Sequence, residues 1–242
     1  MSPGTLVAQL SRPVVTDALV LSLETSAIAQ ALVLLLGTPT AYLIATRRFP
    51  GRSLAVVLVE LPLVLPPAVA GIGLIATFGR LGLLGGTLDA LGVQLGLTQA
   101  AVVIAVAYVA SPFYVRQAIA TFEAVDPDLV AAARTLGAGR ARTFFRVVLP
   151  LARRGLAAGE ALSFARGLGE FGATIMFAGS LQGVTQTLPL AIYQELNVDF
   201  TTALAISAFL VVVSGALLVA LRLTLQWQPS RPTSRFLFAP SR

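Results

Sequence analysis

Charged side chains inside long apolar stretches are the first candidates for chemistry in this sequence. Four of them lie within or at the edge of such a stretch: Glu60, Glu160, Arg166 and Glu170. A charge inside a membrane is costly, so these groups are expected to face one another or a water-filled cavity rather than lipid. On a helix, four small or polar residues would share one face at relative positions 0, 4, 7 and 11: Ser163, Gly167, Glu170 and Thr174.

Two interpretations of this face remain open. It could line a path for a solute, or it could be a polar seam that ties helices together. Arg166 precedes Glu170 by four residues, so the two side chains are able to satisfy each other on one helix. A wall of carboxylates would repel an anionic cargo, which favours pairing of Glu170 with Arg166.

A proline-rich stretch is the second candidate. Pro62, Pro66 and Pro67 each remove a helix hydrogen bond, and Gly71 and Gly73 follow closely. Broken helices are tolerated inside a membrane where protein or a cavity covers the backbone. The break could form a gate whose freed N–H groups meet an oxyanion, or it could be a packing kink. The ability of freed N–H groups to bind an oxyanion slightly favours the gate over the packing kink.

Several residue types that enzymes use are absent. The chain has no His and no Cys, and all seventeen of its basic residues are Arg. Without Lys there is no standard P-loop and no Schiff base, and without His or Cys there is no imidazole base, thiol nucleophile or ordinary zinc site. We therefore predict no catalytic centre, no metal site and no bound cofactor in this chain.

Composition places these residues in a membrane. Of 242 residues, 56% are hydrophobic and 12% are charged, about half the charged fraction of soluble domains. Mean hydropathy is +0.85. The predicted fold class is an all-α integral membrane helical bundle with about five transmembrane helices. Five stretches reach the length of about 20 apolar residues that a span needs: Asp17–Thr46, Leu54–Phe78, Gln99–Ile119, Gly155–Phe177 and Thr201–Leu223.

The arginines predict the orientation of the chain. Fourteen of the seventeen would lie on one side of a five-span protein, against Arg12 and Arg80 on the other and Arg166 inside a span. Because cytoplasmic loops carry the excess of basic residues, the N-terminus is predicted outside and the C-terminus in the cytoplasm. Residues 1–16 would then be an outer segment, residues 17–223 the transmembrane domain and residues 224–242 a cytoplasmic tail.

The cytoplasmic loop of residues 122–152 has clear helix signals. Asp126 suits an N-cap, Pro127 suits the first helical position, and Gly137 suits the stop about ten residues later. A second helix is predicted from about Ala141 to Pro150. The expected result is a compact helix–turn–helix outside the membrane.

Small residues on the first loop helix favour docking to a partner protein. Ala131, Ala132 and Ala133 permit close approach, and Arg134 follows them. Alternatively, the loop is solvated and its arginines only fix topology. Binding to nucleic acid is not needed to explain the arginines, since the orientation bias already accounts for them.

The loop resembles the signature of ABC importer permeases. The run from Ala131 to Pro150 matches the family pattern Glu-Ala-Ala-x3-Gly-x9-Ile-x-Leu-Pro through Gly137, Val147 and Leu149. The departure is Ala131, where the family usually has Glu, which puts one polar contact in doubt. In the family this loop forms a coupling helix that docks into the ATPase subunit. The resemblance implies an ATPase-coupling segment made of Ala131, Ala132, Ala133, Arg134, Thr135, Leu136 and Gly137.

Three further stretches look like the molybdate branch of that family, namely 61–67, 164–174 and 185–189. The resemblance implies a homodimer in the bacterial cytoplasmic membrane. A separate ATPase would bind ATP, and an extracytoplasmic oxyanion-binding protein would deliver the cargo. The candidate residues for the translocation path or polar seam are Pro66, Pro67, Ser163, Arg166, Glu170 and Thr174.

Three alternatives remain. A tungstate or sulfate permease could use the same scaffold. A proton-coupled secondary transporter could use Glu60 or Glu170 as a proton carrier, which would leave the loop signature unexplained. A purely structural membrane subunit would leave the proline-rich span and the polar face without a role.

Overall fold

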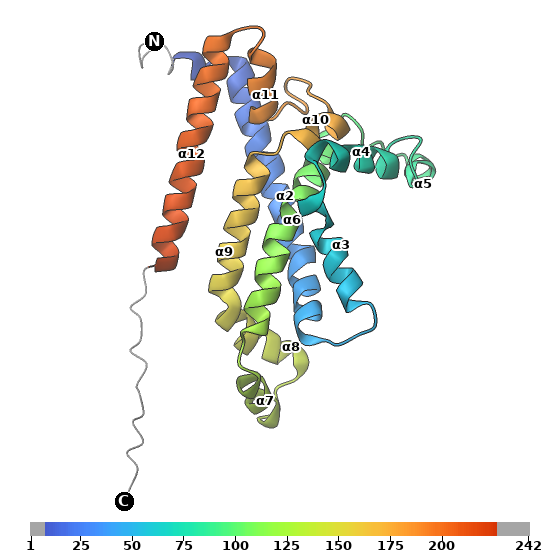
Figure 1. The fold of residues 1–242 in the computed structure, drawn as a ribbon, viewed down its shortest axis with the longest axis vertical. Coiled ribbons are helices and arrows are strands. Elements are labelled where there is room, and N and C mark those ends of the chain that lie inside the picture. The colour runs from blue at the N-terminus through green and yellow to red at the C-terminus, as the bar shows by residue number, and fades with distance from the viewer. Residues whose placement is uncertain (1–7, 227–242) are drawn as a thin grey trace, which may run out of the picture.

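The computed structural model describes residues 8–226, and every regular element in this range is helical. This confirms the all-α prediction. Residues 1–7 of the predicted outer segment and nearly all of the predicted cytoplasmic tail, residues 227–242, lie outside the described residues. Figure 1 shows long helices running along one axis, with α7 (Pro127–Thr135) at one end and α11 (Leu188–Glu195) at the other.

Helix α6 (Gln99–Glu123) lies at the centre of the bundle and packs against α2 (Pro13–Thr46) and α9 (Leu149–Leu168). Helix α2 begins four residues before the predicted start at Asp17. The Thr38 and Tyr114 hydroxyls lie 2.6 Å apart and join α2 to α6. At the end of the bundle that carries α11, α12 (Phe200–Gln226) packs on α11 and α2 through a small apolar cluster.

Glycines set the close contact between α6 and α9. A Cβ atom on Gly155 would lie 2.1 Å from Thr121 Oγ1, and one on Gly159 would lie 2.9 Å from Gln117 Cβ. No larger residue fits at these positions without moving α9 away from α6. This glycine pair therefore has a packing role, since small residues are what allow membrane helices to approach closely.

The proline-rich stretch is broken as predicted. Helix α3 (Arg52–Val64) and helix α4 (Pro67–Phe78) meet at a bend of 120°. Pro66 and Pro67 supply no N–H groups to continue α3, which therefore ends before them. In Figure 1, α4 and the short helix α5 (Gly85–Ala90) project to one side of the bundle.

The prediction of one continuous fourth span, Gly155–Phe177, is wrong. Helix α9 ends at Leu168, and a separate helix α10 (Gly172–Ala178) follows. Gly169 ends α9, and the Glu170 side chain accepts a hydrogen bond from the Ala173 N–H at 2.8 Å, which caps the new helix. Ser163, Gly167, Glu170 and Thr174 therefore do not share one face of one helix.

The loop from 122 to 152 also differs from its prediction at one end. After α7 come α8 (Arg140–Thr143) and a π-helical turn η1 (Phe144–Val148), which runs directly into α9. The predicted helix end at Pro150 is therefore wrong. A proline ring clashes with the carbonyl one α-turn earlier, and the wider π-turn accommodates Pro150 without ending the helix.

Length and composition identify only some of the spans. Among the described residues, α2 and α6 are each long and apolar enough to cross a membrane, and the bent α3–α4 pair makes a third if taken as one span. Helix α9 contains four charged residues, and the apolar part of α12 covers Phe200–Ala216. The number of five spans stays a prediction.

Candidate functional site

Helix α7 has the caps that its sequence predicts. Asp126 Oδ1 accepts a hydrogen bond from the Asp128 N–H at 2.9 Å, and Pro127 occupies the first turn. Gly137 adopts a φ of +81°, a left-handed conformation that ends the helix at little cost. Asp128 in the first turn and Arg134 in the last turn both complement the helix dipole.

The residues predicted to couple to an ATPase lie together on this helix and at its end. No residue of α7 is buried. Ala131 and Ala132 are exposed, and the Leu136 side chain is 88% exposed. An apolar side chain that is almost fully exposed at the tip of a protruding helix is suited to contact with another protein.

An aromatic cluster fixes the base of α7 to the bundle. The Tyr42 ring lies 5.4 Å from the Phe122 ring and 4.7 Å from the Phe144 ring, both in edge-to-face arrangements. These side chains come from α2, α6 and η1. Beside them, a cavity of about 510 Å³ is lined by Arg47 and Arg134, among others. The exposed helix therefore rests on a rigid base.

The structure confirms the predicted pair of Arg166 with Glu170. Arg166 Nη2 lies 2.8 Å from Glu170 Oε2, and the Glu170 side chain is 1% exposed. The other oxygen of Glu170 caps α10 through Ala173. One carboxylate thus joins the end of α9 to the start of α10.

Ser163 belongs to a second buried polar contact, between three helices. Its Oγ lies 2.9 Å from Gln30 Oε1 on α2 and 3.0 Å from the Ala110 carbonyl oxygen on α6. The one hydroxyl hydrogen serves one of these acceptors at a time. Ser163 is fully buried and Gln30 is 4% exposed, so this contact holds helices together in the interior.

The two breaks in the chain meet in space, because α10 packs against α4. A Cβ atom on Gly172 would lie 2.7 Å from Pro67 Cβ, and one on Gly71 would lie 2.7 Å from Met176 Cβ. Thr174 on α10 is fully buried. Pro66 and Pro67 therefore lie near the α9–α10 break, which the sequence alone did not predict.

The six predicted path or seam residues differ in their surroundings. Ser163, Glu170 and Thr174 are buried and Arg166 is partly buried, whereas Pro66 and Pro67 are exposed. None of the six lines any of the five best-defined cavities in residues 8–226. The four polar residues therefore have the burial expected of a polar seam.

A different set of residues lies around Arg116, and of these only its partner Glu60 was a candidate from the sequence. Glu60 on α3 pairs with Arg116 on α6, with Oε1 and Nε 3.0 Å apart. The face of α6 around Arg116 carries residues spaced alternately by three and one: Phe113, Arg116, Gln117, Ala120, Thr121 and Ala124. That spacing is visible in the sequence, but Arg116 was counted there only as a topology signal.

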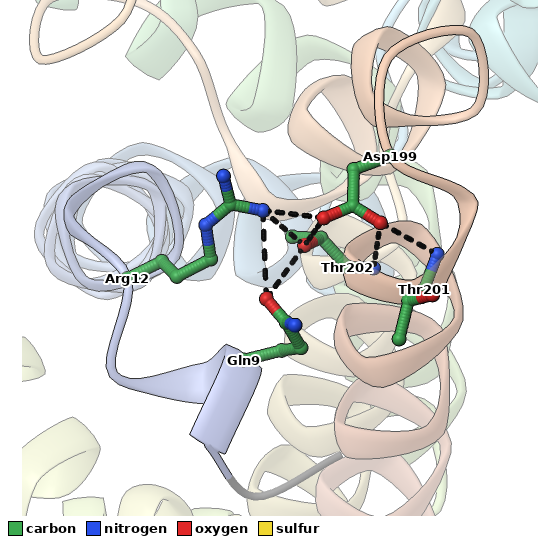
Figure 2. Close-up of polar contacts among 5 residues, drawn as sticks. All are labelled: Gln9, Arg12, Asp199, Thr201 and Thr202. Atoms are coloured by element: carbon green, nitrogen blue, oxygen red, sulfur yellow. Dashed lines mark hydrogen bonds and ion pairs between the residues drawn. The ribbon is translucent and has the colours of Figure 1, made fainter. Parts of the chain in front are cut away.

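A polar cluster at the end of the bundle that carries α11 ties the segment before α2 to the start of α12 (Figure 2). Arg12 Nη1 lies 2.6 Å from Asp199 Oδ2, and Asp199 Oδ1 accepts the Thr201 N–H at 3.0 Å. Thr202 Oγ1 lies within hydrogen-bond distance of Gln9, Arg12 and Asp199. The hydrogen bond from the Thr202 side chain lowers the pKa of Asp199, and backbone N–H groups and the Arg12 charge add to this.

Comparison with known sequences gives a consistent result. Residues 34–226 match the family described as binding-protein-dependent transport system inner membrane component. The molybdenum transport system permease protein ModB of Mycobacterium tuberculosis is 45% identical over 210 residues, which cover 86% of this chain and 79% of that protein. The Escherichia coli protein of the same name is 43% identical over 178 residues, covering 73% of this chain and 78% of that one.

Solved structures support the same fold. A subunit of an inward-facing methionine ABC transporter superposes with a TM-score of 0.67 at 19% identity, covering 93% of this chain and 98% of that one. A chain of a bacterial alginate ABC transporter superposes with a TM-score of 0.70 at 17% identity, covering 93% of this chain and 84% of that one. These likenesses show the fold alone. Taken with the match over residues 34–226, they establish that the chain belongs to the family of binding-protein-dependent transport system inner membrane components.

Proposed function

We propose that this chain is the permease subunit of an ATP-driven importer for molybdate. Relatives that are 43–45% identical over most of the chain are named as molybdenum transport permeases, and this similarity is the observation that carries the proposal. The family consists of membrane components, so ATP hydrolysis belongs to a separate subunit. Membership in it replaces the proton-coupled and purely structural alternatives.

We also propose that α7 is the coupling helix for that ATPase subunit. The support is the absence of buried residues on α7, its position at one end of the bundle and the aromatic cluster at its base. Coupling would use residues 131–137. Ala131 stands where the family usually has Glu, so contact would depend more on the small alanines and on Leu136.

The orientation proposed for the chain follows from the arginines. Helix α7 and the α2–α3 connection lie at the arginine-rich end of the described bundle, whereas α5 and α11 lie at the other end (Figure 1). Placing the arginine-rich end in the cytoplasm puts the N-terminus outside and the C-terminus inside. The extracytoplasmic oxyanion-binding protein would then approach the end that carries α5 and α11.

The translocation path is proposed to form between two copies of the chain. Of its predicted path residues, Ser163, Glu170 and Thr174 are buried and Arg166 is partly buried, whereas Pro66 and Pro67 are exposed and available to line a path. We infer that Ser163, Arg166, Glu170 and Thr174 form the polar seam. Pro66 and Pro67 set the bend that brings α4 onto α10, and so shape the wall of the path near the outer side.

Uptake into proteoliposomes tests this function. The chain is reconstituted with its ATPase subunit and supplied with its binding protein, radiolabelled molybdate and internal ATP. The expected result is uptake that requires ATP and the binding protein. Inhibition of molybdate uptake by added tungstate or sulfate ranks the three anions by how well the transporter accepts them. Stronger transport of sulfate, or uptake driven by a proton gradient without ATP, would contradict the proposal.

A further inference from the structure

An exposed ion pair lies inside the membrane-spanning part of the molecule. Arg116 Nε on α6 contacts Glu60 Oε1 on α3 at 3.0 Å, with side-chain exposures of 60% and 38%. Arg116 lies seven residues before the end of α6 at Glu123, which corresponds to about 10 Å along the helix axis. A guanidinium keeps its charge at any working pH and is too costly to place against lipid at that depth.

The face of α6 that carries Arg116 is unlike the rest of this helix. Val115, Ala118 and Phe122 point into the core and are buried. The opposite face carries the polar side chains of Arg116, Gln117 and Thr121 over more than one helical turn, and we call this face the α6 stripe. It includes Phe113, Arg116, Gln117, Ala120, Thr121 and Ala124. Gln117 and Thr121 also contact α9 at Gly159 and Gly155, so the open part of the α6 stripe consists of Arg116, Ala120 and Ala124, which are exposed. A charged side chain on this open part indicates that it meets water or a polar solute.

Two cavities make the α6 stripe into a continuous groove. A cavity of about 330 Å³ is lined by Leu63, Phe113, Arg116, Gln117 and Ala120. A second cavity, of about 510 Å³, shares Gln117 and Ala120 with the first and continues along α6 to Asp126 and Leu129, at the start of α7. The groove therefore leads from the ion pair to the proposed coupling helix at the cytoplasmic end.

The chemistry of the groove fits a small oxyanion. Arg presents a planar fork of N–H donors that matches the oxygens of an oxyanion, and Gln117 adds an amide donor one residue away. Glu60 touches the guanidinium at Nε, while more than half of the Arg116 side chain stays exposed. An anion approaching along the groove can thus reach Arg116 without first displacing the carboxylate.

We propose that Arg116 binds the transported oxyanion in the inner half of the path and that Glu60 is its counter-ion when no cargo is present. The proposal deepens the proposed function and rests on it. As cargo binds, the guanidinium exchanges part of its contact with Glu60 for the anion. When the Glu60 carboxylate pairs fully with Arg116 again, it favours release of the anion toward the cytoplasm. The phosphate of an anionic lipid has the same chemistry and also fits the groove. The test below distinguishes binding of cargo from binding of such a lipid.

The test uses the complete transporter in proteoliposomes, with molybdate uptake and ATPase activity measured on the same samples. Arg116→Gln is expected to lower uptake about tenfold or more while ATPase stimulation by the loaded binding protein remains. Arg116→Lys keeps the charge without the fork and should retain part of the uptake. Arg52→Gln is the matched control. It breaks the Arg52–Glu123 pair, 2.8 Å long and similarly exposed but outside the α6 stripe, and should change uptake less than about twofold.

Glu60→Gln and the double variant separate cargo binding from a helix-joining role. If Arg116 binds cargo, Glu60→Gln slows uptake by a smaller factor than Arg116→Gln, and the Glu60→Gln/Arg116→Gln double variant is as defective as Arg116→Gln alone. If the pair only joins α3 to α6, both single variants lose uptake equally and the neutral double variant recovers it. That recovery would overturn the proposal.

Two further comparisons complete the test: uptake in vesicles of different lipid composition, and uptake by the variant beside the wild type. The Arg116→Gln defect should be the same in vesicles of phosphatidylcholine alone and in vesicles that contain phosphatidylglycerol. A defect seen only with phosphatidylglycerol would assign Arg116 to a lipid phosphate and overturn the proposal. Normal uptake by Arg116→Gln beside an active wild type overturns this inference alone. A wild type without ATP-dependent molybdate uptake overturns the proposed function as well.

Discussion

Two Arg–Glu pairs in this protein have similar lengths but very different surroundings. Arg166 and Glu170 lie 2.8 Å apart, with Glu170 almost completely buried and capping α10. Arg116 and Glu60 lie 3.0 Å apart, with both side chains partly exposed and Arg116 lining a groove. The carboxylate of Glu170 is hidden from solvent, whereas the guanidinium of Arg116 can be reached from it. The comparison indicates that the first pair maintains the fold and the second is available for exchange.

Removing the buried carboxylate should give the largest change in stability. Glu170→Ala leaves Arg166 unpaired and removes the cap from α10. Breaking a buried ion pair costs about 3–5 kcal/mol, so the variant should unfold or fail to assemble. The measurement is the thermal midpoint of the purified complex in detergent, with size-exclusion chromatography as a second readout. Glu60→Ala is the comparison variant, and an equal loss of stability in it would remove the distinction between the two pairs.

The contact between the two broken segments should give the next largest effect. Gly71→Ala forces a Cβ atom to within 2.7 Å of Met176 Cβ and 2.8 Å of the Ala173 carbonyl oxygen. Such overpacking costs about 1–3 kcal/mol and should lower the thermal midpoint. Gly73→Ala, two residues along the same helix, meets nothing within 4 Å. It should therefore leave the midpoint unchanged or raise it, and a loss as large as that of Gly71→Ala would argue against close packing of α4 on α10.

A substitution on the exposed helix α7 should impair transport without changing the stability of the fold. Ala132→Trp places a large ring on a surface that is expected to contact the ATPase subunit. The free energy of unfolding should change by less than about 0.5 kcal/mol, because no residue of α7 is buried. Copurification of the ATPase subunit and uptake should both be lost. Retention of the ATPase subunit with normal uptake would contradict the docking role, and Asp128→Asn on the same helix serves as a surface control.

A third ion pair, Arg12–Asp199, should give the smallest effect because it lies at the surface. The pKa of Asp199 is lowered in the folded protein, chiefly by the Thr202 hydroxyl, so its contribution is present above its ordinary value of 3.8. That contribution is lost as the pH falls below about 4. The thermal midpoints of wild type and Asp199→Asn should therefore differ slightly at neutral pH and converge in acid. A difference that grows in acid would contradict the sign of the shift.

Local signals made part of this structure predictable from sequence. Asp126, Pro127 and Gly137 define α7 through capping, which depends only on neighbouring residues. Pro66 predicts the break after α3, because a missing N–H acts locally. The Arg166–Glu170 pair follows from a spacing of four residues.

The remaining features depend on contacts between segments that are distant in the sequence. Arg166 and Glu170 flank Gly169, but the sequence alone did not distinguish a helix end there from a polar face on one continuous helix. The reason for the break, a side-chain cap by Glu170 combined with packing of Gly172 on Pro67, requires the tertiary fold. The partnership of Glu60 with Arg116 depends on where α3 crosses α6, although the spacing of polar residues along α6 was visible.

The π-turn η1 has a mechanical consequence. Because it carries Pro150 without interrupting the helix, α8, η1 and α9 form one rod from Arg140 to Leu168, about 40 Å long. Its close contacts with α6 are at Gly155 and Gly159, and its first break is at Gly169. We therefore expect a displacement applied beside α7 to reach the far end of this continuous helix, where α10 packs against α4.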